Sequence, residues 1–115
     1  MREIEKDPQR LYHILEAINN LLTSTNKLNL ENLSEKDLNY FGIVKLLEII
    51  GEASYKLTNE FRNNHQDTPW DDIIGMRHIL VHGYYQVEKK FIINTIRDNL
   101  LPLKKQIEKY LLEIS

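Results

Sequence analysis

Residues 73–85 read IIGMRHILVHGYY, and this stretch gathers more polar chemistry into an apolar segment than any other part of the chain. Aliphatic residues at helical spacing, followed by Gly83, predict a helix that ends at this glycine. His78 and His82, four residues apart, share one face of such a helix. Arg77 and His82, five apart, lie about 140° from each other around the axis. The candidate functional site therefore lies at the end of this helix.

The composition limits what the rest of the chain can be. With 115 residues, we expect a single domain spanning residues 1–115. The absence of cysteine excludes disulfides, thiolate metal ligands and a cysteine nucleophile. No apolar run is long enough for a signal peptide or a membrane span, so we expect a cytoplasmic protein without a membrane partner.

The charge is unevenly distributed. Residues 1–76 carry eight basic and thirteen acidic side chains, a net charge of −5, whereas residues 77–115 carry seven and four, a net charge of +3. The C-terminal third can therefore attract a phosphate backbone, although the whole protein is acidic. An ordinary solvated helix face explains the same lysines.

Hydrophobic periodicity predicts an all-α fold, an antiparallel bundle of four or five helices, since no segment alternates with a period of two. The first helix is expected within residues 5–25, with Asp7 as its N-cap. A second, long helix is expected after a capping box that runs from Ser34 to Asp37, with an apolar stripe that continues to Phe61.

The later helices are predicted from similar signals. Thr68 is expected to cap the motif helix, with proline at the first helical position. Residues 89–98 predict a short helix, and a last helix is expected from about Asn99. Gly51 lies inside the second helix and predicts a close approach of a neighbouring helix. Glu52 is one turn from Glu48, so a cation from another element or another subunit would relieve their repulsion. Two solvated glutamates are the alternative.

Three interpretations fit the polar residues of the motif helix. In the structural one, Arg77 pairs with Asp71 or Glu52, His82 interacts with the last helix carbonyls, and the tyrosines pack. In the second, His78 and His82 bind a metal ion. Two ligands are too few, and a third from His13, His65 or a glutamate has no sequence support.

In the third interpretation the residues cleave RNA. Attack by the 2′-hydroxyl needs a base, a proton donor for the 5′-oxygen and cations near the phosphoryl oxygens. His82 titrates near neutral pH, and Arg77 keeps its charge and can bind two phosphoryl oxygens. Tyr84 can orient the phosphate or stack on a base. One histidine cannot be acid and base at once, so this interpretation predicts a homodimer.

Three segments resemble a known family. The run RHILVHGY at residues 77–84 resembles the Arg-x4-His-x-Tyr motif of HEPN-domain ribonuclease toxins of the HepT type. LLEIIGEA at residues 46–53 resembles the EIIGEA helix of these proteins, and TPWDDIIGMR at residues 68–77 resembles their PWxxIIGMR lead-in. With the closing amphipathic helix, the resemblance covers nearly the whole chain.

The resemblance implies a dimeric, HEPN-like helical bundle that cleaves RNA without a metal ion or another cofactor. The arginine and histidine of the composite dimer site map onto Arg77 and His82. The position after the arginine is often asparagine or aspartate and is His78 here, in a supporting role. Such toxins usually pair with an MNT-type nucleotidyltransferase antitoxin, which neutralises some members by transferring AMP to the motif tyrosine. That tyrosine maps onto Tyr84, and the adjoining Tyr85 is a second candidate.

The sequence leaves one alternative of a different class open. The same residues can belong to a non-enzymatic helical module that binds a nucleotide or a partner protein. The RNA sequence and the dimer interface are not encoded in any motif. Neither is the choice between covalent AMPylation and simple complex formation as the means of regulation.

Overall fold

The computed structural model describes residues 6–114, apart from the side chain of Tyr84. No strand forms in this part of the chain, which confirms the predicted all-α class. The elements are α1 (Asp7–Thr25), η2 (Leu30–Asn32), α2 (Leu38–Lys56), α3 (Asn59–Asn63), α4 (Trp70–Gly83), η3 (Tyr84–Gln86), α5 (Lys89–Asn94), η4 (Thr95–Asn99) and α6 (Leu100–Ile114).

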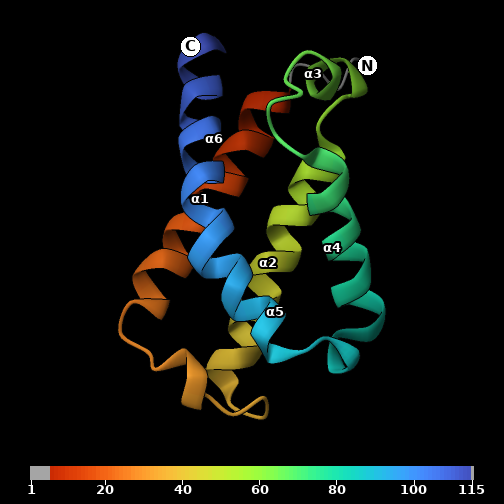
Figure 1. The fold of residues 1–115 in the computed structure, drawn as a ribbon. Helices are drawn as coiled ribbons and strands as arrows, with labels where there is room; N and C mark the ends of the chain where they lie inside the picture. The colour runs from red at the N-terminus through yellow and green to blue at the C-terminus, as the bar shows by residue number, and fades with distance from the viewer. Residues whose placement is uncertain (1–5, 115) are drawn as a thin grey trace.

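The long helices form an antiparallel bundle (Figure 1). α1 packs against α2 and α6, and α2 packs against α4 on its other side. Each helix turns one apolar stripe inward, and the stripes meet in a continuous core centred on residues such as Leu11, Ile18, Leu47 and Ile107. α4 is therefore a flanking helix that depends mainly on α2 for its position.

The start of α1 differs from the prediction. The N-cap is Lys6 and its side chain makes no capping hydrogen bond, so the prediction that Asp7 is the N-cap was wrong. The Asp7 carboxylate is buried and accepts hydrogen bonds from the backbone N–H of Thr58 (3.0 Å) and from its hydroxyl (2.8 Å). A buried carboxylate needs such donors, and Thr58, the N-cap of α3, supplies them from 51 residues away.

The predicted capping box and the length of the second helix also need correction. α2 is capped by Asp37, which accepts from the backbone N–H of Asn39 (2.8 Å), whereas Ser34 accepts from Lys36 within the preceding turn. The helix ends at Lys56, because Leu57 and Thr58 are extended and Thr58 caps the separate helix α3. Phe61 therefore belongs to α3 and not to the stripe of α2.

The two predicted C-terminal helices are one helical run. Asn94, Thr95 and Leu100 all keep helical backbone angles, and a π-turn at Thr95–Asn99 joins α5 to α6. Pro102 lies shortly after this turn. A proline cannot donate a backbone hydrogen bond and its ring crowds the preceding turn of a helix. A wider turn at that place relieves the conflict, so the helical run continues through it.

The segment between α1 and α2 is fastened to this C-terminal run. The Lys89 ammonium donates to the backbone carbonyls of Glu31 (2.9 Å) and Leu33 (2.8 Å), at the end of η2. Arg97 Nη2 donates to the Glu31 carboxylate, and this hydrogen bond lowers the pKa of Glu31. Basic residues of the C-terminal third therefore hold a loop in place, so they are not all free for an external anion.

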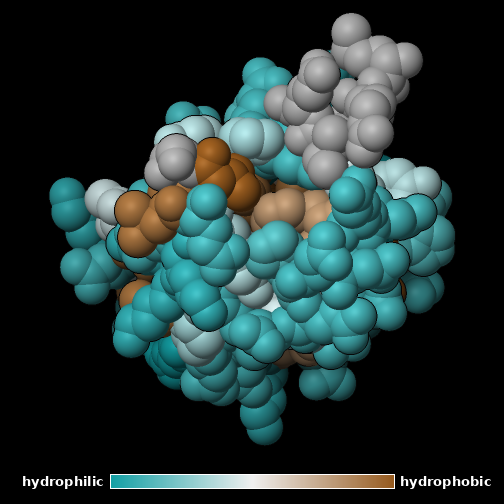
Figure 2. All heavy atoms as spheres, turned by 90° about the horizontal axis from the view of Figure 1, so that it is seen from above, coloured by the Kyte–Doolittle hydropathy of each residue, from teal (hydrophilic) through white to brown (hydrophobic). Residues whose placement is uncertain are grey.

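The end of the bundle seen in Figure 2 is mainly hydrophilic. Figure 2 looks down on the end of the bundle where α3 and the end of α6 lie, and it shows polar residues interrupted by some hydrophobic side chains. Among the described residues, no helix combines the length and the apolar character that crossing a membrane would need.

Candidate active site

The motif residues are carried by α4, which is anchored at its start. Trp70 is buried, and its indole N–H donates to the carbonyl of His65 (3.0 Å). Thr68 just before the helix is also buried; its hydroxyl donates to Gln106 (2.9 Å) and lies 2.6 Å from the hydroxyl of Tyr110. The Thr68 hydroxyl, which was predicted to cap α4, contacts α6 instead.

Gly51 allows α4 to lie directly against α2. A Cβ built on this glycine would overlap Cβ of Arg77 and would lie 2.9 Å from its Cγ and 3.2 Å from its Cα. No real side chain fits at such distances, so only glycine permits the observed approach. The predicted close approach is confirmed, and the element that approaches is the motif helix at Arg77 itself.

The guanidinium of Arg77 is held by the next residue of α2. Arg77 Nη2 lies 2.7 Å from Glu52 Oε1, and both side chains are partly exposed. The ion pair confirms the prediction that a cation from another helix lies beside Glu52. It is also one of the two pairings that the structural interpretation gave for Arg77. Glu52 also approaches the Lys56 ammonium, at 3.7 Å, through its other oxygen.

This ion pair is incomplete in its hydrogen bonding. Arg77 Nε and Glu52 Oε1 are buried without a hydrogen-bond partner among the described residues, although Oε1 is the oxygen in the short contact with Nη2. The distance establishes charge pairing, and the absence of a hydrogen bond at Oε1 shows that the groups are not aligned as a closed fork. An arginine with spare donors can still bind another anion.

His82 and His78 lie together on the exposed side of α4. Their ring centroids are 4.6 Å apart with the rings tilted by 57°, as the spacing of four residues predicted. Both side chains are exposed, and neither imidazole makes a hydrogen bond within the described part of the chain. Arg77 instead faces α2, so one chain brings His78 and His82 together and leaves Arg77 on a different side.

The metal interpretation gains no third ligand from the structure. In residues 6–114, no group of three or more histidine, cysteine, aspartate or glutamate side chains is arranged to hold a metal ion. His65 is engaged elsewhere. Its ring stacks on Phe61, and its nitrogens approach the Phe61 carbonyl (2.7 Å) and the Glu113 carboxylate (3.3 Å).

The two tyrosines follow the end of α4 directly. Tyr84 begins the short helix η3, and its side chain lies outside the described part of the structure. Tyr85 is 70% exposed. The predicted modification site therefore lies two residues after His82, just past the end of α4.

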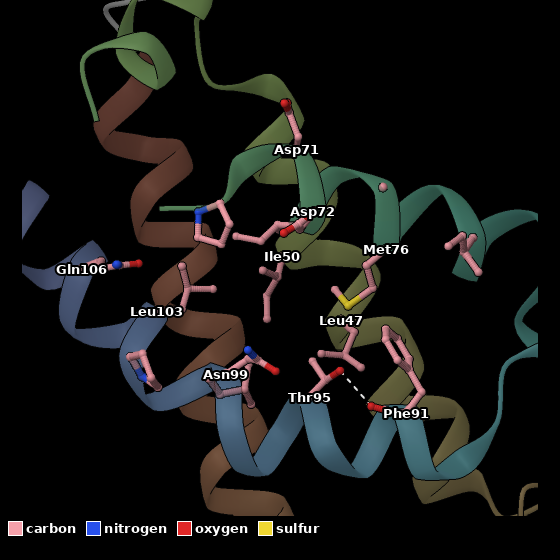
Figure 3. A pocket seen from close by; sticks show the side chains of 16 residues that line it. Leu47, Ile50, Asp71, Asp72, Met76, Phe91, Thr95, Asn99, Leu103 and Gln106 are labelled. Atoms are coloured by element: carbon pink, nitrogen blue, oxygen red, sulfur yellow. Dashed lines mark hydrogen bonds between the residues drawn. The ribbon is translucent and has the colours of Figure 1, made fainter. Parts of the chain in front are cut away.

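An apolar groove beside α4 was not predicted from the sequence. It has a volume of about 610 Å³ and lies between α2, α4 and the run from α5 to α6. Figure 3 shows Leu47, Met76, Phe91 and Leu103 around this space, with Asp71 and Asp72 on α4 near it. Hydrophobic periodicity placed the apolar residues of this lining on apolar helix faces, but it did not predict a groove between the helices.

Comparisons with known proteins agree with the motif. The family described as "Ribonuclease HepT-like" matches residues 14–110. A protein of Thermococcus cleftensis named "Probable ribonuclease HepT" is 32% identical over 109 residues, which cover 95% of this chain and 97% of the relative. A protein of Caldanaerobacter subterraneus subsp. tengcongensis named as a "Putative RNase" is 36% identical over 101 residues, covering 88% and 90%.

A further relative from Methanocaldococcus jannaschii, also named as a "Putative RNase", is 30% identical over 98 residues, which cover 85% of this chain and 90% of the relative. No solved structure gives a significant match. The matched region includes α2, α4 and most of α6, and so contains every residue of the candidate site. The chain belongs to the HepT-like ribonuclease family.

Proposed function

We propose that this chain is a metal-independent RNA endonuclease, the toxin of a toxin–antitoxin pair, with Arg77 and His82 as its catalytic residues. The observation that carries the proposal is the arrangement on α4. Gly51 and Glu52 hold Arg77 against α2, while His82 stands exposed at the open end of the same helix. Family membership adds the reaction class, cleavage of RNA.

The chemistry follows from what these side chains can do. A neutral His82 takes the proton of a 2′-hydroxyl, whose oxygen attacks the adjacent phosphorus while the bond from phosphorus to the 5′-oxygen breaks. A protonated imidazole gives its proton to the departing 5′-oxygen. Arg77 stabilises the charge on the phosphoryl oxygens. The products are a 2′,3′-cyclic phosphate and a free 5′-hydroxyl, so the proton count balances.

Two imidazoles in different protonation states are needed, and a homodimer supplies them. His82 of one copy acts as base and His82 of the second as acid, across a two-fold axis. The surface around the motif suits a second copy, because Ile79 and Val81 on α4 are 54% and 43% exposed. Exposed aliphatic side chains next to exposed histidines favour a protein contact beside a polar cleft. His78 has a supporting role in this cleft.

Regulation is proposed to act at the same helix end. An MNT-type nucleotidyltransferase antitoxin would transfer AMP to Tyr84, which directly follows α4. The adduct adds bulk and a negative charge near His82, so it would fill the cleft and repel RNA phosphate. Co-expression with the antitoxin, followed by intact mass and peptide mapping, distinguishes Tyr84 from Tyr85 as the acceptor.

A second candidate function is supported by the groove. An apolar cavity of about 610 Å³ is of the size that holds a small ligand or the side chains of a partner. Asp71 and Asp72 belong to its lining and disfavour RNA there. A non-enzymatic module that binds a partner protein through this groove is therefore the alternative.

The decisive experiment uses purified chain whose intact mass shows no adduct. We expect it to cleave single-stranded RNA in excess chelator. Loss of cleavage that zinc restores would favour the metal interpretation at His78 and His82. No cleavage by the unmodified protein, with or without metal, would favour the binding module.

A further inference from the structure

We infer that Glu52 is a positioning residue for RNA cleavage, which it serves by orienting the guanidinium of Arg77. The inference rests on the proposed function, in which Arg77 contacts the phosphoryl oxygens. It adds a residue of α2 to a site that the motif places entirely on α4 and η3. Two consecutive residues, Gly51 and Glu52, form a seat for the arginine.

Gly51 fixes where the arginine begins. Because Cα, Cβ and Cγ of Arg77 all crowd the position of a missing Cβ, the first carbons of the arginine side chain lie flat on α2. The remaining freedom lies in the outer bonds of the side chain. A long, flexible side chain that is fixed only at its base can point in several directions.

The charge of Glu52 draws the guanidinium toward α2. Its Oε1 lies 2.7 Å from Arg77 Nη2, and Nη2 is the only guanidinium nitrogen of Arg77 in an ion pair among the described residues. The charge pair therefore leaves Nη1 for a substrate phosphate. Arg77 remains 31% exposed, so a phosphate can reach it without unfolding the contact between α2 and α4.

Lys56 explains why the charge of Glu52 matters as well as its shape. The Lys56 ammonium lies 3.7 Å from Glu52 Oε2, so the carboxylate stands between two cations. Without the negative charge, Lys56 and Arg77 would repel each other across this position. The guanidinium would then move from its oriented state, and a misplacement of about 1 Å can cost about 100-fold in rate.

A structural role alone predicts a different result. A partly exposed ion pair contributes about 0–1 kcal/mol to stability, so its loss should hardly change the melting temperature. A positioning role acts in the transition state and lowers kcat, while the KM for RNA changes little. The two roles are therefore separable by kinetics on a folded variant.

The test compares Glu52→Gln with Glu48→Gln, measuring kcat, KM and melting temperature with one single-stranded RNA. Glu48 is the matched control, since it lies one turn earlier on α2 and has no ion pair in the described structure. We expect Glu52→Gln to lower kcat by about 10- to 100-fold with KM within about threefold. Glu48→Gln should match the wild type, and both variants should melt at the wild-type temperature.

Glu52→Asp keeps the charge but draws the carboxylate back by one methylene, and kcat should fall to an intermediate value. If Glu52→Gln lowers the melting temperature, the kcat of Glu52→Asp tests the positioning role instead. A wild-type kcat in both variants overturns the positioning role and leaves the proposed function standing. A higher kcat/KM in Glu52→Gln also overturns it, because Glu52 would then compete with RNA for Arg77. Failure of the wild-type protein to cleave RNA overturns both proposals.

Discussion

The two ends of α4 are held in opposite ways. At its start, Trp70 is 5% exposed and bonds to the carbonyl of His65, and Thr68 contacts Tyr110 on α6. At its end, His82 and Ile79 are exposed, and the imidazole makes no hydrogen bond within the described residues. The start of α4 is therefore part of the core, whereas its end is exposed on the surface.

This difference explains how a small bundle can support a precise site. Anchored contacts at the start of α4, together with the seat for Arg77 at its middle, fix the direction of the helix. The exposed end of α4 can then contact RNA and a second copy without any loss of contacts in the core. Sites are most precise when rigid elements carry them, and here the anchoring contacts lie about one to three turns before the histidine.

The anchored end should dominate stability. We expect Trp70→Ala to lower the free energy of unfolding by about 3–5 kcal/mol, because it empties a buried site and removes the hydrogen bond to His65. Chemical denaturation measures this loss. The control is Ile79→Ala at the open end, which should cost less than about 1 kcal/mol since its side chain is 54% exposed. Equal losses in the two variants would contradict the contrast between the ends.

The contact between α2 and the middle of α4 should respond to a smaller change in side-chain volume. Gly51→Ala places a methyl group on Arg77 and forces α4 away from α2, which should cost about 1–3 kcal/mol and also reduce cleavage. Gly42→Ala is the matched control, because Gly42 also lies on α2 and a Cβ there meets nothing within 4 Å. That variant should gain about 0.5–1 kcal/mol. Similar stabilities for the two alanine variants would refute the close approach.

The smallest expected effect is a pH dependence of the anchored end. Burial raises the pKa of Tyr110 above its usual value of about 10, so the folded protein keeps this phenol protonated when the unfolded chain begins to ionise. The resulting stability is fully present below about pH 10 and is lost as the pH rises through the folded pKa.

Tyr110→Phe should therefore flatten the alkaline loss in unfolding free energy, at a neutral-pH cost of about 1 kcal/mol for the lost contact with Thr68. Tyr12→Phe, at an exposed position on α1, should leave the alkaline profile unchanged. An unchanged profile in Tyr110→Phe would show that other groups cause the alkaline loss.

Periodicity predicted the helices because it depends only on neighbours in the chain. It failed at the caps, where Asp7 and Thr68 have the right local chemistry but bond to Thr58 and Tyr110, which are 51 and 42 residues away. Tertiary partners of this kind leave no local signal. The bounds of these two helices were nevertheless close to the prediction, since α1 spans Asp7–Thr25 and α4 ends at Gly83.

The candidate site shows the same division. The motif named Arg77 and His82, and the glycine at position 51 indicated a close contact. The sequence did not decide that Arg77 is the residue seated on Gly51, because the register between two helices depends on the packing of both. The groove beside α4 could not be predicted from the sequence. An apolar stripe has the same sequence pattern whether the neighbouring helix packs against it or leaves a groove.

Cleavage of RNA by His82→Ala, compared with His78→Ala and the wild type, tests the account most directly. All three proteins must show intact masses without an adduct and equal melting temperatures, because both histidines are exposed. We expect His82→Ala to lose about 100- to 10,000-fold in rate and His78→Ala to retain most of its activity. Wild-type cleavage by rigorously purified His82→Ala would contradict the central claim that the open end of α4 carries the catalytic acid and base.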